Sequence, residues 1–258
     1  MAISAEKYQR GRVVFRKDHA TDLWTIRVAP EKRIDFEPGQ YVTLGLPDGA
    51  SGKMIERAYS VCSAPAEEEL EFFFELVPHG QLTPKLYQLN AGDELWMRHR
   101  AKGAFTLDRK SGRRNHFMVT TVTGVAPAVS MVRSLRQANP DLRMIIVQAA
   151  SRSYELGYRE ELERAAAGSG GWLKYIPTVS RPWEDADWRG EVGRAEDVLR
   201  KYLDLYEMTP ENCSTYLCGH PQMIENGKGI LLRRGFDRAQ VHVEIYWMPP
   251  RAEKVATT

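Results

Sequence analysis

Apolar and polar residues alternate in short runs along the first hundred residues, the pattern of β-strands with one buried face. Turn residues such as Pro38-Gly39 separate the runs. Short strands at this regular spacing predict a small antiparallel barrel or sandwich. The expected strands span residues 8–16, 23–28, 41–44, 57–63, 70–77 and 94–99, with a connector at 19–22.

Strongly apolar runs alternate with helical periodicity in the second half, which predicts a parallel sheet covered on both faces. Such sheets bind ligands at the carboxyl ends of their strands. The polar, basic residues 108–115 are interpreted as a linker, so the expected domains span 1–110 and 111–258. The five expected strands span 117–122, 144–147, 173–176, 215–218 and 241–246, and helices are expected from 128, over 158–167, around 198–203 and over 223–234.

A short helix interrupts the first β region. Thr83 is a favourable N-cap and Pro84 suits the first helical position, so a short helix is expected to start there, run through 85–89 and end at 90–93. Its N-terminus presents free N–H groups to an anion. A helix that only plugs the end of a barrel is equally compatible with this pattern.

Composition narrows the function classes. The chain has 258 residues and a net charge of +2, which gives no global sign of nucleic-acid binding. No apolar run approaches the ~20 residues of a membrane span. The first residues lack an apolar signal core, so a cytoplasmic protein is expected. The three cysteines fit no metal-site spacing, so no metal or iron–sulfur cluster is expected.

The segment Arg57-Ala58-Tyr59-Ser60 carries the first candidate chemistry. Arg57 and Tyr59 share one face of a strand, where a guanidinium suits a phosphate and an aromatic ring suits a flat heterocycle. The Ser60 hydroxyl can bond a heteroatom at the edge of that heterocycle. Together they suggest a flavin nucleotide. Four residues alone also fit an ordinary strand with a surface arginine.

Loops after the strands of the second half carry further candidates. Thr123-Gly124 precedes Pro127 at the start of a helix, where nucleotide phosphates commonly lie. Arg152, Arg181 and Arg194 follow strand ends and together fit a 2′-phosphate. Taken singly, each arginine is more simply a solvated surface residue.

The last two strand ends complete the pattern. Cys218-Gly219 joins a strand to a helix, so the thiol could lie against a reacting ring or simply fill the core. Tyr246 and Trp247 could cover a flat cofactor or pack internally. Glu244 is either a proton relay or a surface carboxylate.

These motifs, in their order along the chain, closely resemble those of the ferredoxin–NADP(+) reductase family, especially its bacterial flavodoxin/ferredoxin branch. They are Arg57-Ala-Tyr-Ser60, Gly80-Gln-Leu-Thr-Pro84, Thr123-Gly-Val-Ala-Pro127, Cys218-Gly-His-Pro-Gln-Met223 and Val243-Glu-Ile-Tyr-Trp247. The resemblance implies an N-terminal six-stranded antiparallel FAD barrel and a C-terminal Rossmann-like NADP domain. It implies that Ser60, Cys218, Glu244 and Tyr246 act in catalysis. It assigns FAD to Arg57, Ala58, Tyr59, Ser60, Phe73, Gln81, Leu82, Thr83, Thr123, Tyr246 and Trp247. It assigns NADP to Thr123, Gly124, Ser151, Arg152, Arg181, Arg194, Cys218, Gly219, Gln222 and Met223.

The family's chemistry is hydride exchange between NADP(H) and FAD and one-electron exchange with ferredoxin or flavodoxin. The resemblance further implies that Tyr246 swings aside for the nicotinamide. Two features depart from the family: Val122 replaces a usual glycine, and residues 248–258 extend the chain beyond Trp247. A tail that folds back on the flavin site and a disordered tail both fit this composition.

Two other functions remain compatible with the residues. One is an NADH-dependent reductase of an oxygenase, which would have to pass electrons to a separate protein because no cysteine cluster is present. The other is a non-catalytic flavin conduit, against which the arginine set argues. A monomer is expected. A docking face for an acidic carrier and an ordinary solvated face both fit the basic residues Arg10, Arg12, Arg98, Arg100, Lys102 and 109–114.

Overall fold

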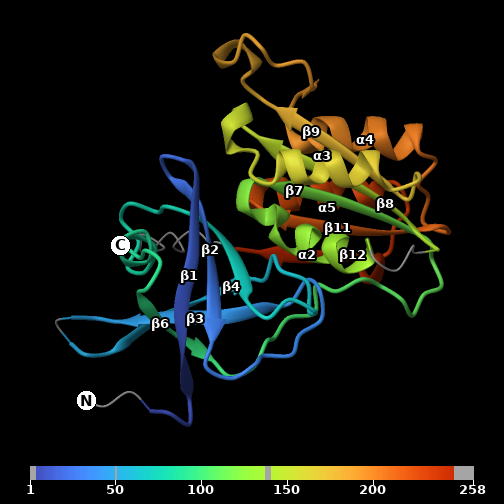
Figure 1. Cartoon of the computed structure of the whole chain (residues 1–258). Coiled ribbons are helices and arrows are strands. Elements are labelled where there is room, and N and C mark those ends of the chain that lie inside the picture. The colour runs from blue at the N-terminus through green and yellow to red at the C-terminus, as the bar shows by residue number, and fades with distance from the viewer. Residues whose placement is uncertain (1–3, 50, 137–140, 247–258) are drawn as a thin grey trace, which may run out of the picture.

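The computed structural model describes residues 4–49, 51–136 and 141–246. These residues form two domains that lie side by side, each built on its own sheet (Figure 1). No helix among them is long and apolar enough to cross a membrane. Residues of both domains line the two cavities described below.

The first domain is a six-stranded antiparallel sheet with strand order β4-β3-β6-β1-β2-β5. A bridge between Val61 and Phe72 joins the end of β4 to β5, so the sheet closes into the expected barrel. The strands are β1 (Tyr8–Ala20), β2 (Leu23–Pro30), β3 (Tyr41–Pro47), β4 (Met54–Ser60), β5 (Leu70–Glu75) and β6 (Glu94–Arg98).

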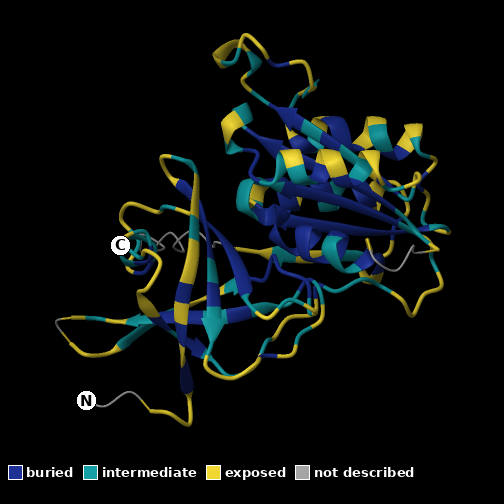
Figure 2. Ribbon diagram, in the orientation of Figure 1, coloured by how far each residue is buried: buried dark blue, intermediate teal, exposed yellow. Residues whose placement is uncertain are grey.

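Side-chain size explains how the barrel fills. Trp24, Phe72 and Phe74 are fully buried in one cluster, and the rings of Trp24 and Phe74 stack with centroids 5.2 Å apart. The three phenylalanines of β5 are buried on both faces, because Phe73 turns towards the second domain. Figure 2 shows buried and exposed residues alternating in the first part of β1, up to Val13, as in a strand over a barrel core, whereas the rest of β1 has no buried residue.

Two sequence expectations for this domain need correction. β1 continues through the predicted connector to Ala20, because residues 16–20 still pair with β2. Leu82 occupies the N-cap position of helix α1 (Thr83–Leu86) without a side-chain capping bond, and Thr83 is the first helical residue. The Thr83 hydroxyl instead accepts a hydrogen bond from the backbone N–H of Val77 at 3.1 Å, so it ties the helix to the segment just after β5 and does not cap it.

The second domain is a parallel sheet with strand order β10-β9-β8-β7-β11-β12. Its strands are β7 (Asn115–Thr121), β8 (Arg143–Ala150), β9 (Leu173–Val179), β10 (Glu191–Val192), β11 (Cys213–Gly219) and β12 (Val241–Ile245). This is one strand more than the five predicted. Two-residue β10 carries no apolar run to mark it, and it pairs with β9 through only Thr178 and Val179.

Helices cover both faces of this sheet, as the apolar strands require. Helices α2 (Ala126–Leu135) and α3 (Arg159–Ala167) pack on one face around Met118 and Ile146. Helices α4 (Ala195–Leu205) and α5 (Pro221–Arg233) pack on the other around Val119 and Leu217. The central strands are accordingly buried along their length in Figure 2. Short 3-10 turns, η1 (Val122–Val125), η2 (Ser153–Glu155), η3 (Pro182–Glu184) and η4 (Arg238–Gln240), lie in the connections.

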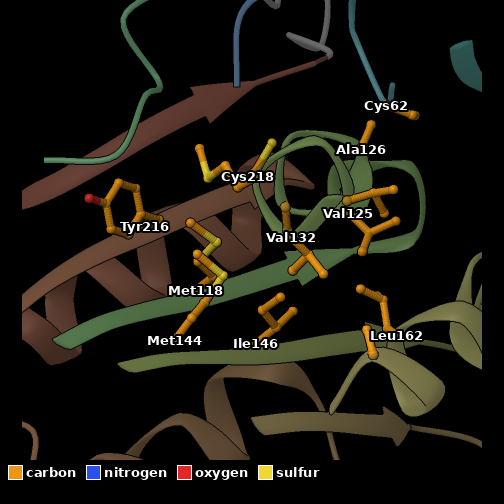
Figure 3. Close-up of a cluster of buried hydrophobic side chains, with 14 of the residues drawn as sticks. Cys62, Met118, Val125, Ala126, Val132, Met144, Ile146, Leu162, Tyr216 and Cys218 are labelled. Atoms are coloured by element: carbon orange, nitrogen blue, oxygen red, sulfur yellow. The ribbon is translucent and has the colours of Figure 1, made fainter. Parts of the chain in front are cut away.

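The two domains share one apolar cluster. Cys62, Phe73 and Phe105 of the first domain are buried with Ala126 and Tyr216 of the second. Figure 3 shows Cys62 beside Ala126 at the edge of this cluster. A continuous core of this kind fixes the domains against each other, so groups at their junction keep a defined geometry.

Candidate functional site between the domains

A cavity of about 620 Å³ opens where the barrel meets the second domain. Arg57, Ala58, Tyr59 and Ser60 all line it, on the last residues of β4. Phe73, Gln81, Leu82, Thr83, Thr123 and Tyr246 line it as well. The structure therefore brings together every described residue that the family resemblance assigned to FAD.

The lining combines a charged group, the Arg57 guanidinium, with an aromatic ring, that of Tyr59. Arg57 pairs across the sheet with Leu44 and Tyr59 with Val42, so both side chains project on the same face of β4. The Arg57 guanidinium donates to the carbonyl of Glu56 at 2.7 Å and forms no ion pair within the described residues. The Tyr59 ring is fixed edge-on against Phe74, with centroids 4.8 Å apart. A free cation thus stands next to an immobilised ring.

Ser60 and Glu244 connect the two domains inside this cavity. The Ser60 hydroxyl donates to Glu244 Oε1 at 3.1 Å, across 184 residues of chain. Glu244 Oε2 is buried and has no hydrogen-bond partner. Burial raises the pKa of Glu244 to about 7, although the Ser60 hydrogen bond lowers it. The carboxyl group of Glu244, which lines the cavity, thus has a pKa near 7 and one oxygen without a hydrogen-bond partner.

This pKa predicts a pH-dependent effect of Glu244 on stability. The carboxyl group ionises near 4.5 in the unfolded chain but only near 7 in the fold, so the folded state is penalised as pH rises through that window. We expect Glu244→Gln to raise the free energy of unfolding of the FAD-free protein at pH 8 by about 1–2 kcal/mol. At pH 4.5 the two proteins should unfold alike. Denaturant titrations at both pH values measure this, and an equal difference at both would contradict it.

A second cavity, of about 720 Å³, lies over the carboxyl ends of the parallel strands. Thr123, Ser151, Arg181, Arg194, Gly219, Gln222 and Met223 line it. The two cavities share Glu75, Val77, Thr123 and Tyr246 on their walls. Tyr246 thus stands at the boundary between the FAD residues and the nucleotide loops.

Two glycines allow the strand-end loops to meet. A Cβ on Gly124 would lie 2.3 Å from the carbonyl oxygen of Cys218, and one on Gly219 would lie 2.1 Å from Thr121 Oγ1. Gly219 also has a φ of +129°, which disfavours a side chain. Val122 has a φ of 43°, which is strained for a β-branched residue. This is the position where the family usually has glycine.

The three arginines predicted to bind a 2′-phosphate differ in whether they line the second cavity, which is called the nucleotide cavity below. Arg181 and Arg194 line the nucleotide cavity. Arg152 is absent from the lining because its guanidinium turns to Glu155, at 3.1 Å, and to Glu184. The predicted convergence of three free cations is therefore only partial in this structure.

Cys218, Phe73 and Trp247, three further predicted site residues, differ in how they relate to the cavities. The Cys218 thiol is fully buried in the shared core, and burial raises its pKa well above the usual range. It is therefore a protonated core residue beneath the cavities. Phe73 is also buried and packs edge-on against Tyr158 and against Gly157, which leaves only part of its ring at the cavity. Trp247 and the tail lie outside the described residues.

Sequence reasoning missed several lining residues. Tyr41 and Phe74 line the first cavity, Glu196 lines the second, and Glu75 lines both. Burial raises the pKa of Glu75, and the nearby carboxylates of Asp22 and Glu155 add to this. The one sequence feature that could have indicated Glu75 is its position directly after the three phenylalanines of β5. Tyr41 and Glu196 stand in ordinary strand and helix contexts and gave none.

Comparison with known proteins identifies this architecture. The family described as "Oxidoreductase FAD-binding domain" matches residues 15–105, and "Oxidoreductase NAD-binding domain" matches residues 118–228. "Ferredoxin--NADP reductase A" of Sorangium cellulosum is 30% identical over 87% of this chain and 83% of its own length. "Flavodoxin/ferredoxin--NADP reductase" of Rhodobacter capsulatus is 31% identical over 78% of this chain and 77% of its own.

The chain belongs to the ferredoxin–NADP reductase family. It is an oxidoreductase with one FAD-binding and one NAD(P)-binding domain. Its fold agrees with that of a ferredoxin NADP+ reductase from Neisseria gonorrhoeae with bound FAD and NADP, at 24% identity and a TM-score of 0.82 over 93% of this chain and 99% of that one. These relatives favour the reductase over the oxygenase-type and conduit alternatives.

The cavity of the reductase fits a flavin nucleotide on its own chemistry. It offers one free guanidinium, one immobilised aromatic ring and a hydroxyl–carboxyl pair with an unpartnered oxygen. Those groups match a diphosphate, a planar ring and the polar edge of that ring. Within the described residues, no cluster of His, Cys, Asp or Glu could hold a metal ion.

Proposed function

We propose that this reductase exchanges a hydride between NADP(H) and bound FAD and single electrons with a ferredoxin or flavodoxin. The observation that carries the proposal is the junction of the two cavities at Thr123 and Tyr246. A nucleotide lying over the strand ends would meet a ring bound beside Ser60 at this junction. When bound, FAD would supply the redox chemistry, since a flavin can exchange a hydride with a nicotinamide and pass on electrons singly.

The barrel residues hold and orient the flavin in this proposal. Arg57 would pair with its diphosphate, and Tyr59, fixed by Phe74, would stack on its ring. Gln81, Leu82 and Thr83 supply the wall at α1. Because α1 has only four residues, contacts from this wall matter more than a helix dipole.

Ser60, Glu244 and Tyr246 act at the reacting edge. Ser60 holds its hydroxyl between Glu244 and the flavin edge. Glu244, with a pKa raised to about 7, can hold or release a proton there at physiological pH. Tyr246 covers the place where a nicotinamide must lie, so its ring has to move aside for hydride transfer.

An anaerobic titration with NADPH and, separately, NADH tests the proposal through the flavin absorbance. We expect a yellow protein that NADPH bleaches at lower concentration than NADH. Equal bleaching by both would retain the flavin site and show that the arginines give the wild-type protein no preference for NADPH. Bleaching by neither would contradict hydride exchange, and a colourless protein that takes up no FAD would contradict the whole assignment.

A basic groove offers a docking surface for the electron carrier. It adjoins the FAD cavity, sharing Tyr41, Arg57 and Ala58 with it. Of its cations, Arg98 is neutralised by Glu56 at 2.6 Å, whereas Arg100 and Lys102 form no ion pair among the residues described. Arg10 likewise pairs with Glu94, and Arg113 with Asp108. Unpaired positive charge therefore lies beside the flavin cavity, where an acidic carrier would approach.

Reversing this charge should slow electron delivery to the carrier. We expect Arg100→Glu with Lys102→Glu to lower kcat/KM for ferredoxin reduction about tenfold or more at low salt and much less at high salt. NADPH reduction of the flavin should not change. Arg10→Glu, a charge already paired outside the groove, is the matched control. An unchanged rate at low salt would remove the groove as the docking surface.

The domain boundary near residue 110, the monomeric state and the cytoplasmic location remain predictions. Asp108 accepts a hydrogen bond from Ser214 at 2.8 Å, and its backbone N–H donates to the Tyr216 hydroxyl at 2.8 Å. These contacts support a boundary that lies just before Asp108, with the rest of the linker held on the second domain.

A further inference from the structure

One carboxylate bridges two of the arginines predicted to hold a 2′-phosphate. Glu184 Oε2 accepts a hydrogen bond from Arg152 Nε, and Glu184 Oε1 lies 3.5 Å from Arg181 Nη1. Arg152 and Arg181 follow the carboxyl ends of the neighbouring strands β8 and β9. Glu184 therefore occupies the position between the two guanidinium groups that a phosphate would need.

A second carboxylate completes the neutralisation of Arg152 but is held differently. Glu155 Oε1 lies 3.1 Å from Arg152 Nη1, while Glu155 Oε2 accepts the backbone N–H groups of Ser151, at 2.8 Å, and Arg152, at 3.3 Å. These backbone bonds make Glu155 part of the loop's own structure. Glu155 is thus a fixed component of the site.

Glu184 is the displaceable partner. Among the residues that the structure describes, its carboxylate pairs with the two arginines alone, and its side chain is 33% exposed. It ends the short turn η3, and its neighbour Trp183 is 75% exposed. A carboxylate on an open turn can rotate away at little cost when a more strongly charged phosphate arrives.

We propose that Glu184 determines coenzyme specificity by competing with the 2′-phosphate for Arg152 and Arg181. The competition lowers the affinity for NADPH and leaves that for NADH unaffected, since NADH carries no 2′-phosphate. This reductase therefore discriminates between the coenzymes less than its arginine set would allow. The inference rests on the proposed NADP site, and it assigns to that site a residue that opposes binding.

Binding of two small probes to the FAD-loaded protein tests this competition. The probes are 2′-phospho-AMP, which carries the phosphate, and 5′-AMP, which lacks it; calorimetry gives both Kd values. We expect Glu184→Gln and Glu184→Ala to lower the Kd of 2′-phospho-AMP roughly fivefold to tenfold, because two partly exposed ion pairs no longer compete. The Kd of 5′-AMP should stay within about twofold.

Asp187→Asn is the matched control. Asp187 lies three residues beyond Glu184 in the same loop, and its carboxylate makes no ion pair within the described residues. Removing its charge should leave both Kd values unchanged, which separates competition at the arginines from a general gain of positive charge.

The outcomes distinguish this inference from the function on which it rests. If wild-type protein binds 2′-phospho-AMP better than 5′-AMP but the Glu184 variants bind it equally well or more weakly, Glu184 positions the arginines or is inert, and only this inference falls. If no variant prefers 2′-phospho-AMP, the NADP site falls with it. A preference that appears only when Glu184 is replaced supports both.

Discussion

Replacing Glu71 with alanine should destabilise the reductase by about 1.5–3 kcal/mol, because the hydrogen bonds that a buried carboxylate accepts from charged and polar partners are lost. Glu71 is 3% exposed and lies on β5, at the face of the barrel that meets the second domain. It accepts hydrogen bonds from Arg27 at 2.6 Å and Tyr158 at 2.7 Å, and Arg133 lies 2.9 Å away. Arg133 and Tyr158 belong to the second domain, so the loss falls on the domain junction.

The pH dependence of this loss has a definite sign. Burial alone would raise the pKa of Glu71, but Arg133, Arg27 and Tyr158 together lower it. A lowered pKa contributes stability that is present above the unfolded value of 4.5 and is lost as pH falls below it. The difference between wild-type protein and Glu71→Ala in denaturant unfolding should therefore be large at pH 7 and shrink below pH 4.

Glu67→Ala is the control for Glu71. Glu67 also approaches Arg133, at 3.7 Å, but its side chain is 36% exposed, so its removal should cost less than about 1 kcal/mol. Equal losses from the two substitutions would show that the buried network does not join the domains. The same junction carries the nucleotide loops, so Glu71→Ala should also slow flavin reduction by NADPH.

Arg57→Ala should weaken FAD binding about tenfold to a hundredfold, the loss expected when a charge-assisted hydrogen bond to a phosphate is removed. Arg57 has no carboxylate partner among the described residues, so its removal leaves no buried charge behind, and the fold should retain its stability. The Kd of FAD, measured by quenching of flavin fluorescence on adding the FAD-free protein, reports the change.

Arg12→Ala provides the comparison for Arg57. Arg12 is an exposed arginine of β1 that does not line the FAD cavity. Its removal changes the net charge equally and should leave the Kd of FAD unchanged. If both substitutions weaken FAD binding alike, the effect is one of overall charge, and Arg57 makes no specific contact with the cofactor.

Local pattern was enough to predict the barrel strands, the parallel sheet and the positions of the strand-end loops. It failed where pairing alone defines an element. β10 has two residues and becomes a strand only because Thr178 and Val179 lie beside it. Thr83 reads as a cap from its neighbours, yet its hydroxyl is used by Val77. In both cases tertiary contacts override local preference.

The candidate site likewise combines features that local sequence predicts with features that depend on tertiary contacts. Residue types at strand ends indicated the two ligands, but the states of those residues depend on partners far along the chain. Nothing near Arg152 predicts that Glu184, across the next strand, neutralises it. Ser60 meets Glu244 only when the domains associate. Charge balance at a site is a property of the fold, so sequence alone could name the cations but could not show which are free.

The hydrogen bond between Ser60 and Glu244 has a consequence for when the flavin can bind during synthesis of the chain. Synthesis proceeds from the N-terminus, and domains fold as units as they appear. The barrel, complete by Arg98, can form long before β12 exists. Its flavin cavity still lacks Glu244 and Tyr246 at that stage, since both lie on or just after the last strand. The ribosome must therefore finish nearly the whole chain before the cofactor can meet a closed binding site, which couples flavin retention to the completion of synthesis.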